Sequence, residues 1–309
     1  MEKLNEDILF EIGKFTRNLR KEVSSMPKVG MDITQIIDFV EKSIFERGYL
    51  PAFPCTVSVN DVAAHYTVFD EGYLLKKGDL IKIDFGVSKD GFITDNAISI
   101  EIEDNKHKKL MDANFEGLNA IMENIEISST MSDLGKIVDG VARKHGFNTI
   151  HNLSGHQIGR NDLHCGLSVP NYENGDGRKV EDNSEFAIEP FFTYGSPKVK
   201  SCGPSNILHL TNNKPVRDPI AKKVLDFIKE NYPYLPFSKR WLLKEVRENL
   251  GLEGGLEKRK VLYALKVLKL NNIIYEYDAL STVDGSIVSQ FEDAVIFSNG
   301  KKHIITRLR

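Results

Sequence analysis

The sequence predicts an α+β fold made of two related halves and a helical insert. Two amphipathic helical patterns, at 4–23 and 33–44, precede an alternating strand hairpin at 81–100. The same order, two helical patterns before a strand, returns after residue 107. The stretch 214–275 differs from both halves, because its apolar residues keep helical spacing among many basic ones. These observations indicate a duplicated α-α-β unit that carries a small helical insertion.

The first half opens with a pair of helices. Apolar residues recur at three- and four-residue steps from Leu4 to Val23, which is the spacing of an amphipathic helix. Asp32 precedes the second apolar series and is a suitable N-cap for that helix. The proline-rich stretch 51–54 then ends the pair, because proline cannot continue a helix.

Short motifs of the first half return in the second. Arg47-Gly48-Tyr49 resembles His145-Gly146-Phe147, after the second helical pattern of each half. A small residue before a histidine also recurs, at 63–65 and at 154–156. Chance similarity between amphipathic helices explains each single match equally well, so the predicted duplication rests on the common order of the motifs.

Two aspartates share one face of the predicted hairpin. If residues 90–91 form a two-residue turn, Asp84 faces Ala97. Asp95 then faces Gly86, and the two carboxylates are diagonal neighbours about 7–8 Å apart at the backbone. Carboxylates this close repel each other unless a proton or a cation lies between them. The pair indicates a cation site, and the alternative is two carboxylates exposed to solvent.

Two further acids and one histidine lie in or beside β-rich apolar runs. Glu189 and Glu292 are embedded in such runs, where an acid is unfavourable unless it is paired or bound to a metal. His156 follows a short apolar segment. The alternative for each is an exposed residue on a half-buried strand. Four carboxylates and one imidazole are a ligand set for paired Mn, Fe, Co or Zn ions. No CxxC motif occurs, which excludes a cysteine-rich structural zinc site.

The predicted insert, 214–275, has an order of its own. Three helical patterns precede a short β-rich run at 272–275, which suggests a small winged-helix-like unit. Lys and Arg outnumber Asp and Glu in this stretch, although the whole chain has a net charge of −3. A basic surface for ribosomal or other RNA is one interpretation. A solvated helical decoration is the simpler one, and we favour it.

Composition sets the class of protein and its compartment. Hydrophobic residues make up 41% and charged residues 28%, as in soluble globular proteins. The three cysteines are few and irregularly spaced, which argues against a disulfide framework and for a reducing compartment. No apolar run is long enough for a signal peptide or a membrane span. We therefore expect a cytoplasmic protein.

The order of short motifs, from about residue 5 to residue 300, resembles that of the methionine aminopeptidases. The insert resembles the helical subdomain of type 2, and the absence of a long N-terminal extension resembles the archaeal form. The resemblance implies the pita-bread (creatinase/aminopeptidase) fold with its internal pseudo-twofold duplication. It assigns 1–213 and 276–309 to the catalytic domain and 214–275 to the inserted subdomain. The motifs are Ala63–Thr67, Lys82–Gly86, Asp95, Leu153–His156, Leu163–Gly166, Phe186–Phe191 and Ser289–Glu292.

The resemblance also implies a ligand set for two divalent metal ions. Asp84 and Asp95 are metal ligands, and Asp95 bridges both ions. His156 and Glu189 bind one ion, and Glu292 is a second bridge. Glu189 is in addition the acid that takes up and passes on a proton. The identity of the ions, Co, Mn, Fe or Zn, stays open, because this ligand set accepts several of them.

Two histidines and an apolar pocket complete the implied site. His65 and His164 flank the scissile peptide, where they bind substrate and take part in catalysis. Phe53, Leu163 and Tyr277 match by their spacing the residues that line the pocket for the methionine side chain. The alternative for each histidine is a structural role, in which its ring nitrogens are satisfied by hydrogen bonds within the protein.

The implied activity is removal of the initiator methionine from nascent polypeptides with a small second residue. A hydroxide activated by the two metal ions attacks the carbonyl of the first residue. The expected partners are the N-termini of nascent chains, with transient contact to the ribosome left open. We expect no membrane, no specific DNA and a monomer.

Three other functions remain to be distinguished. A proline-specific aminopeptidase or prolidase shares the fold but usually carries a large extra N-terminal domain. A non-catalytic protein on the same scaffold would bind RNA through the basic insert, but such relatives have lost metal ligands. A winged-helix DNA-binding regulator would rest on the insert alone and leaves the carboxylates and histidines unexplained.

Overall fold

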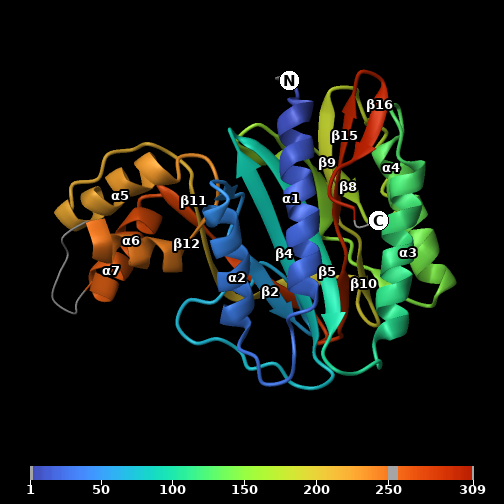
Figure 1. The fold of residues 1–309 in the computed structure, drawn as a ribbon, viewed down its shortest axis with the longest axis horizontal. Helices are drawn as coiled ribbons and strands as arrows, with labels where there is room; N and C mark the ends of the chain where they lie inside the picture. Colours follow the sequence, from blue (N-terminus) through green and yellow to red (C-terminus); the bar gives the residue numbers. More distant parts are fainter. Residues whose placement is uncertain (1–2, 250–256, 308–309) are drawn as a thin grey trace.

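The structure is a computed structural model that describes residues 3–249 and 257–307 (Figure 1). The first half contains α1 (Glu6–Ser24), α2 (Ile33–Glu46), β1 (Leu50–Pro51), β2 (Thr56–Val59), β3 (Val62–Ala64), β4 (Leu80–Lys89) and β5 (Phe92–Glu101). The second half continues with α3 (Lys108–Asn124), α4 (Met131–Lys144), β6 (Asn148–Thr149), β7 (Ser154–Gly159), β8 (Asp162–Pro170), β9 (Ser184–Ile188), β10 (Phe191–Thr193) and β11 (Val199–Leu210). The insert and the C-terminal part contain α5 (Pro219–Asn231), β12 (Phe237–Ser238), α6 (Lys239–Asn249), α7 (Glu257–Leu270), β13 (Ile274–Thr282), β14 (Val288–Gln290), β15 (Asp293–Ser298) and β16 (Lys301–Ile304).

The predicted repeat is confirmed at the ends of α2 and α4. Gly48 and Gly146 both have a positive φ, 82° and 77°, which glycine adopts without strain. In each half the aromatic residue that follows returns a hydrogen bond to the helix, from Tyr49 N to Ile44 O at 3.2 Å and from Phe147 N to Ala142 O at 2.9 Å. Both helices therefore end in the same glycine-dependent C-terminal motif.

The proposed parallel between the two histidines does not extend to the backbone. His65 follows the end of β3 and has a φ of 67°, whereas His156 lies inside β7. A small residue before a histidine was too short a pattern to define the conformation of either residue.

The predicted hairpin register is confirmed residue by residue. Asp84 pairs with Ala97, and Gly86 pairs with Asp95. The asparagine-like positive φ of Asp90, 53°, and that of Gly91, 82°, make the tight turn that sets this register.

An isolated bridge joins β5 of the first half to the segment between β14 and β15. β4 lies between β5 on one side and β1 and β2 on the other, while β9 pairs with β7 and β15. Ala97 on β5 forms an isolated antiparallel bridge with Glu292, and Glu292 N donates to Ala97 O at 3.0 Å. The bridge brings two carboxylates that are far apart in the sequence, those of Asp95 and Glu292, to one place.

The helices of each half cover the outer face of its strands. Ile83 and Phe85 on β4 are fully buried in a cluster with α1 and α2. Phe186 and Ile188 on β9 belong to a second cluster, with α3 and α4 (Figure 1). Side chains alternate along a strand, so Asp84, next to Ile83 and Phe85, faces away from the helices. The same alternation directs Glu189, the residue after Ile188, away from α3 and α4.

The insert lies to one side of the catalytic layers and has its own apolar core (Figure 1). β11 leads into it and β13 leads out, and both strands pair along most of their length. Trp241 joins it to the first half, because its Nε1 donates to Glu41 on α2 at 2.8 Å. Arg240 also pairs with Glu41. Three helices before a strand were predicted, whereas the short strand β12 between α5 and α6 was not. The boundaries 214–275 stay a prediction.

None of the helices in the described part of the chain has the length and apolar composition that crossing a membrane requires.

Candidate metal centre

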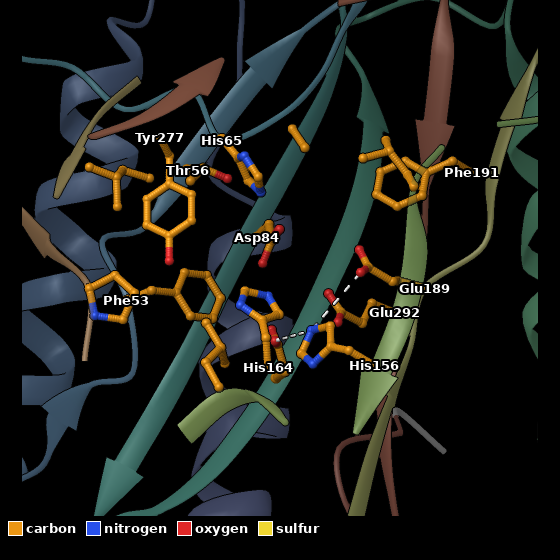
Figure 2. Close-up of a pocket in the computed structure, with 16 residues that line it drawn as sticks. Phe53, Thr56, His65, Asp84, His156, His164, Glu189, Phe191, Tyr277 and Glu292 are labelled. Atoms are coloured by element: carbon orange, nitrogen blue, oxygen red, sulfur yellow. Dashed lines mark ion pairs between the residues drawn. The ribbon is translucent and has the colours of Figure 1, made fainter. Parts of the chain in front are cut away.

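All the predicted site residues line one pocket between the two halves and the insert (Figure 2). They come from nine separate elements or loops. They are Phe53, His65, Asp84, Asp95, His156, Leu163, His164, Glu189, Tyr277 and Glu292.

The first pair of acids is positioned by the hairpin. Asp84 and Asp95 project from β4 and β5 toward the pocket, because their neighbours along each strand face the helices. Thr94, for example, contacts α1 through a 2.8 Å hydrogen bond to Thr16. Asp95 is 3% exposed, so it is almost entirely removed from water.

The second pair of acids comes from the matching strand pair of the other half. Asp293 on β15 lies opposite Ile188 on β9. Continued by one residue beyond β9 and β15, this antiparallel register sets Glu292 opposite Glu189. The second pair of acids therefore lies at the ends of two paired strands. The Ala97–Glu292 bridge then joins the two pairs.

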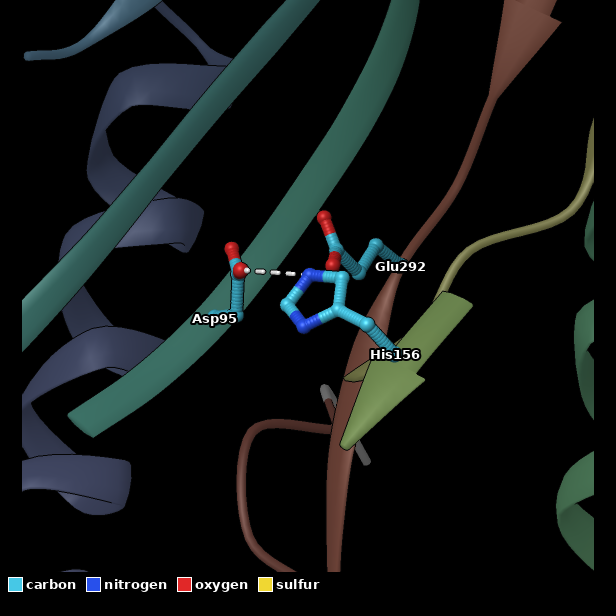
Figure 3. A group of neighbouring side chains, drawn as sticks. All are labelled: Asp95, His156 and Glu292. Carbon is cyan, nitrogen blue, oxygen red and sulfur yellow. Dashed lines mark ion pairs between the residues drawn. The ribbon is translucent and has the colours of Figure 1, made fainter. Parts of the chain in front are cut away.

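His156 lies between the carboxylates of both halves. Its Nε2 is 3.5 Å from Asp95 Oδ2 and 4.0 Å from Glu189 Oε1. One possible ligand atom from each of Asp95, His156 and Glu292 lies within 4.8 Å of the others (Figure 3). A single cation can therefore reach all three side chains.

The buried oxygens of this cluster have few partners. Within the described residues, Asp84 Oδ1, Asp95 Oδ1 and both carboxylate oxygens of Glu292 accept no hydrogen bond. Buried polar atoms are normally satisfied, and leaving a charged one unpaired is unfavourable. Hard or borderline divalent cations bind oxygen and imidazole nitrogen, so the donor set fits such ions.

Burial and mutual repulsion disfavour the ionised carboxylates. Burial, with the neighbouring carboxylates adding to it, holds the pKa of Asp84, Glu189 and Glu292 well above its usual range. Burial raises the pKa of Asp95 to about 7. It lowers the pKa of His156 to about 4, which keeps the imidazole in the neutral form that binds metals. A cation among these groups would stabilise the ionised carboxylates and lower their pKa values.

The other two histidines stand at the rim of the cluster. The rings of His164 and His156 are 4.3 Å apart between centroids. Burial, with the neighbouring His156 and His65 adding to it, lowers the pKa of His164 to about 3. His65 Nδ1 lies 3.2 Å from the backbone oxygen of Asp278. A carbonyl oxygen only accepts, so Nδ1 carries the proton and Nε2 of the neutral ring is an acceptor.

Comparison with known proteins decides the family. The model of metallopeptidase family M24 matches residues 7–212, more than half of the chain. The chain belongs to this family. The M24 peptidase is 35% identical over 300 residues to a methionine aminopeptidase of Methanocaldococcus jannaschii, covering 97% of each chain. It is 37% identical over 302 residues to that of Thermococcus kodakarensis, covering 97% of this chain and 99% of the relative.

A solved structure supports the fold of this M24 peptidase. The crystal structure of methionine aminopeptidase from Rickettsia prowazekii aligns with a TM-score of 0.68 at 19% identity, covering 99% of this chain and 100% of that one. The predicted pita-bread fold and the predicted resemblance to methionine aminopeptidases are both confirmed. Membership in a metallopeptidase family also implies that the chain depends on divalent metal.

Some residues in or beside the pocket of this M24 peptidase had no role predicted from the sequence. Gln290 lies two residues before Glu292, and its Nε2 donates to Asp84 Oδ2 at 3.3 Å and to Glu189 Oε2 at 3.2 Å. The motif Ser289–Glu292 contains Gln290, but nothing local in that motif shows that its side chain reaches Asp84 and Glu189. Ile207 and Pro236 also line the pocket. They had no signal, because Ile207 on β11 and Pro236 in the insert are brought to the pocket only by contacts between segments distant in the sequence.

Proposed function

We propose that the chain removes the initiator methionine from nascent proteins and that its pocket holds two divalent ions. The observation that carries the proposal is that four carboxylates and His156 converge on one partly apolar pocket. Several of the buried carboxylate oxygens accept no hydrogen bond within the described residues. The relatives named methionine aminopeptidase, at 35–37% identity over nearly the full length, support the substrate.

Each ligand has a proposed task. Asp84 and Asp95 would hold the ions from the first half, and Asp95 and Glu292 would bridge them. His156 and Glu189 would complete one coordination sphere from the second half. Two bound ions would lower the pKa of a water molecule toward neutrality and polarise the substrate carbonyl.

Glu189 is the proposed proton carrier. Glu189 lies among the proposed ligands, so bound cations would keep its carboxylate ionised and able to accept a proton. It would take the proton of the attacking water and deliver it to the leaving nitrogen. Gln290 donates to Glu189 Oε2, so one carboxylate oxygen is oriented and Oε1 stays directed toward His156.

The two rim histidines are proposed to bind the reacting peptide. His164 is neutral at pH 7 because its pKa is about 3, and a neutral ring can still donate one N–H to the developing oxyanion. His65 presents Nε2 as an acceptor, which suits the N–H of the scissile amide. This assigns His65 to orientation of the substrate.

The apolar wall of the pocket is proposed to select methionine. Phe53 and Leu163 are buried together in one small apolar cluster. Tyr277 stacks edge-on against His65 at 5.8 Å between ring centroids and narrows the space beside the reacting bond. An unbranched thioether fits a slender apolar pocket, and the narrow rim favours a small second residue. The proposed setting is the cytoplasm, where nascent N-termini occur.

The proposed function predicts methionine release that depends on added metal. The peptide Met-Ala-Ser should be cleaved after its first residue, and a chelator should stop cleavage until Mn, Fe, Co or Zn is added back. Peptides of the form Xaa-Pro are the comparison, assayed by mass spectrometry under the same conditions. Faster cleavage of Xaa-Pro than of Met-Ala-Ser, or full activity under chelation, would contradict the proposal.

The pocket wall predicts a selective loss of methionine recognition. Phe53→Leu should lower kcat/KM for Met-Ala-Ser by about fivefold, because about 1 kcal/mol of apolar contact with the substrate side chain is lost. Phe186→Leu is a matched control, since Phe186 is buried on the helix-covered face of β9. Equal losses in both variants would show a general packing effect and would count against a specificity role of Phe53.

A further inference from the structure

A buried ion pair lies directly behind Glu292. Arg20 on α1 and Asp293 at the start of β15 have side chains that are only 6% and 2% exposed. Arg20 Nη2 lies 2.8 Å from Asp293 Oδ1. Neither residue lines the pocket, so the pair has no direct part in the site described above.

The guanidinium of Arg20 also binds the backbone on both sides of this pair. Its Nη1 donates to Glu292 O at 2.8 Å, and its Nη2 donates to Thr306 O at 2.7 Å. One side chain of the first helix therefore holds the residue before β15 and a residue near the C-terminal end. The planar fork of arginine can serve three acceptors at once, which a single lysine ammonium does less well.

Thr306 completes the network. Its Oγ1 donates to Asp293 Oδ1 at 3.1 Å and accepts from Ala294 N at 2.7 Å. Asp293 is thus held from two sides, and the backbone on both sides of Asp293 is fixed. The network is fully inside the protein, where hydrogen bonds are strong and geometrically specific.

The backbone of Glu292 has one further restraint. β14 ends at Gln290 and β15 begins at Asp293, so Glu292 lies between two strands. In the described chain its ladder-like contact is the bridge to Ala97, in which Glu292 N donates to Ala97 O at 3.0 Å and Ala97 N donates to Glu292 O at 3.4 Å. The 2.8 Å bond from Arg20 to the same oxygen is the shorter of the two.

The carboxylate of Glu292 depends on this backbone for its direction. Neither of its oxygens accepts a hydrogen bond within the described residues. Nothing at the carboxylate itself therefore sets its orientation before a cation binds. A rotation of the peptide unit at Glu292 would carry the carboxylate away from Asp95 and His156.

We propose that Arg20, oriented by Asp293 and Thr306, is a positioning residue that pre-arranges Glu292 for metal binding. The inference rests on the proposed function, since it requires Glu292 to be a ligand. Residues that orient a metal ligand typically contribute a factor of 10–100 to metal affinity. If the ion pair were purely structural, its removal would change the stability of the protein and leave the metal affinity of the folded protein unaltered.

The test compares Mn²⁺ affinity among folded variants of the full chain by isothermal titration calorimetry. Arg20→Met combined with Asp293→Leu replaces the pair by apolar groups of similar size, which often preserves stability. We expect Mn²⁺ binding about 10–100-fold weaker, with an unchanged circular dichroism spectrum. Arg20→Lys keeps the charge and should fold even if the double variant does not. The Mn²⁺ affinity of Arg20→Lys should lie between that of the wild type and that of the double variant.

Two reference variants separate the outcomes. Val23→Ala removes buried packing from the same helix without touching the network, and it should keep wild-type Mn²⁺ affinity. Wild-type affinity in Arg20→Lys and in the folded double variant, or an equal loss in Val23→Ala, would overturn the positioning role alone. Unweakened Mn²⁺ binding in Glu292→Gln would overturn the proposed ligand role and this inference together.

Discussion

Replacing Asp95 or Glu292 by alanine is expected to abolish metal binding and peptide hydrolysis together. Each is almost fully buried, and each is close enough to His156 to share a cation with it. A cation at such a site supplies several kcal/mol of transition-state stabilisation. Loss of about 4 kcal/mol corresponds to about a thousandfold in rate, so kcat should fall by at least that factor.

The matched control for these variants lies on the same hairpin. Asp90→Asn changes an exposed carboxylate at the turn, and asparagine accepts the positive φ found there. Metal content would be measured by atomic emission after dialysis, and release of methionine from Met-Ala-Ser by chromatography. Turnover near the wild-type rate in Asp95→Ala or Glu292→Ala would reject the bridging role of that residue.

His164→Ala is expected to lower kcat by about 100–1000-fold while metal stays bound. This is the usual effect of removing one donor to a developing oxyanion. Geometry distinguishes His164 from the proposed ligands. His156 Nε2 is the imidazole nitrogen that faces Asp95 and Glu189. His164 packs against the outer side of that ring at 4.3 Å between centroids.

The control for His164 is a variant that keeps a donor. His164→Asn retains an N–H group and should recover part of the rate, whereas His156→Asn should lose metal. Both are checked by calorimetric titration with Mn²⁺ alongside steady-state kinetics. If His164→Ala loses metal as His156→Asn does, then His164 is a ligand and the oxyanion role is wrong.

Local patterns were predictable wherever neighbouring residues set the geometry. The turn at Asp90 and Gly91 determines the register of β4 and β5, so the shared face of Asp84 and Asp95 followed from spacing alone. The N-cap of α2 was predictable for the same reason, since Asp32 accepts from Thr34 N at 2.8 Å.

Contacts between distant segments had no comparable signal. Gln290 bridges Asp84 and Glu189 only because the Ala97–Glu292 bridge brings the two halves together. Pro236 of the insert and Ile207 on β11 line the same pocket as Asp84 although they are more than 100 residues away from it in the sequence.

The sequence by itself determined the residue types, their order and the face of each strand on which they stand, because turns, caps and alternation are local properties of the chain. It also carried the family, through motifs matched along nearly the whole length. Only the tertiary structure decided that these side chains share one pocket and that Arg20 stands behind Glu292. The physical reason is that such pairings depend on how two separately formed layers pack against each other, and no local rule encodes that distance.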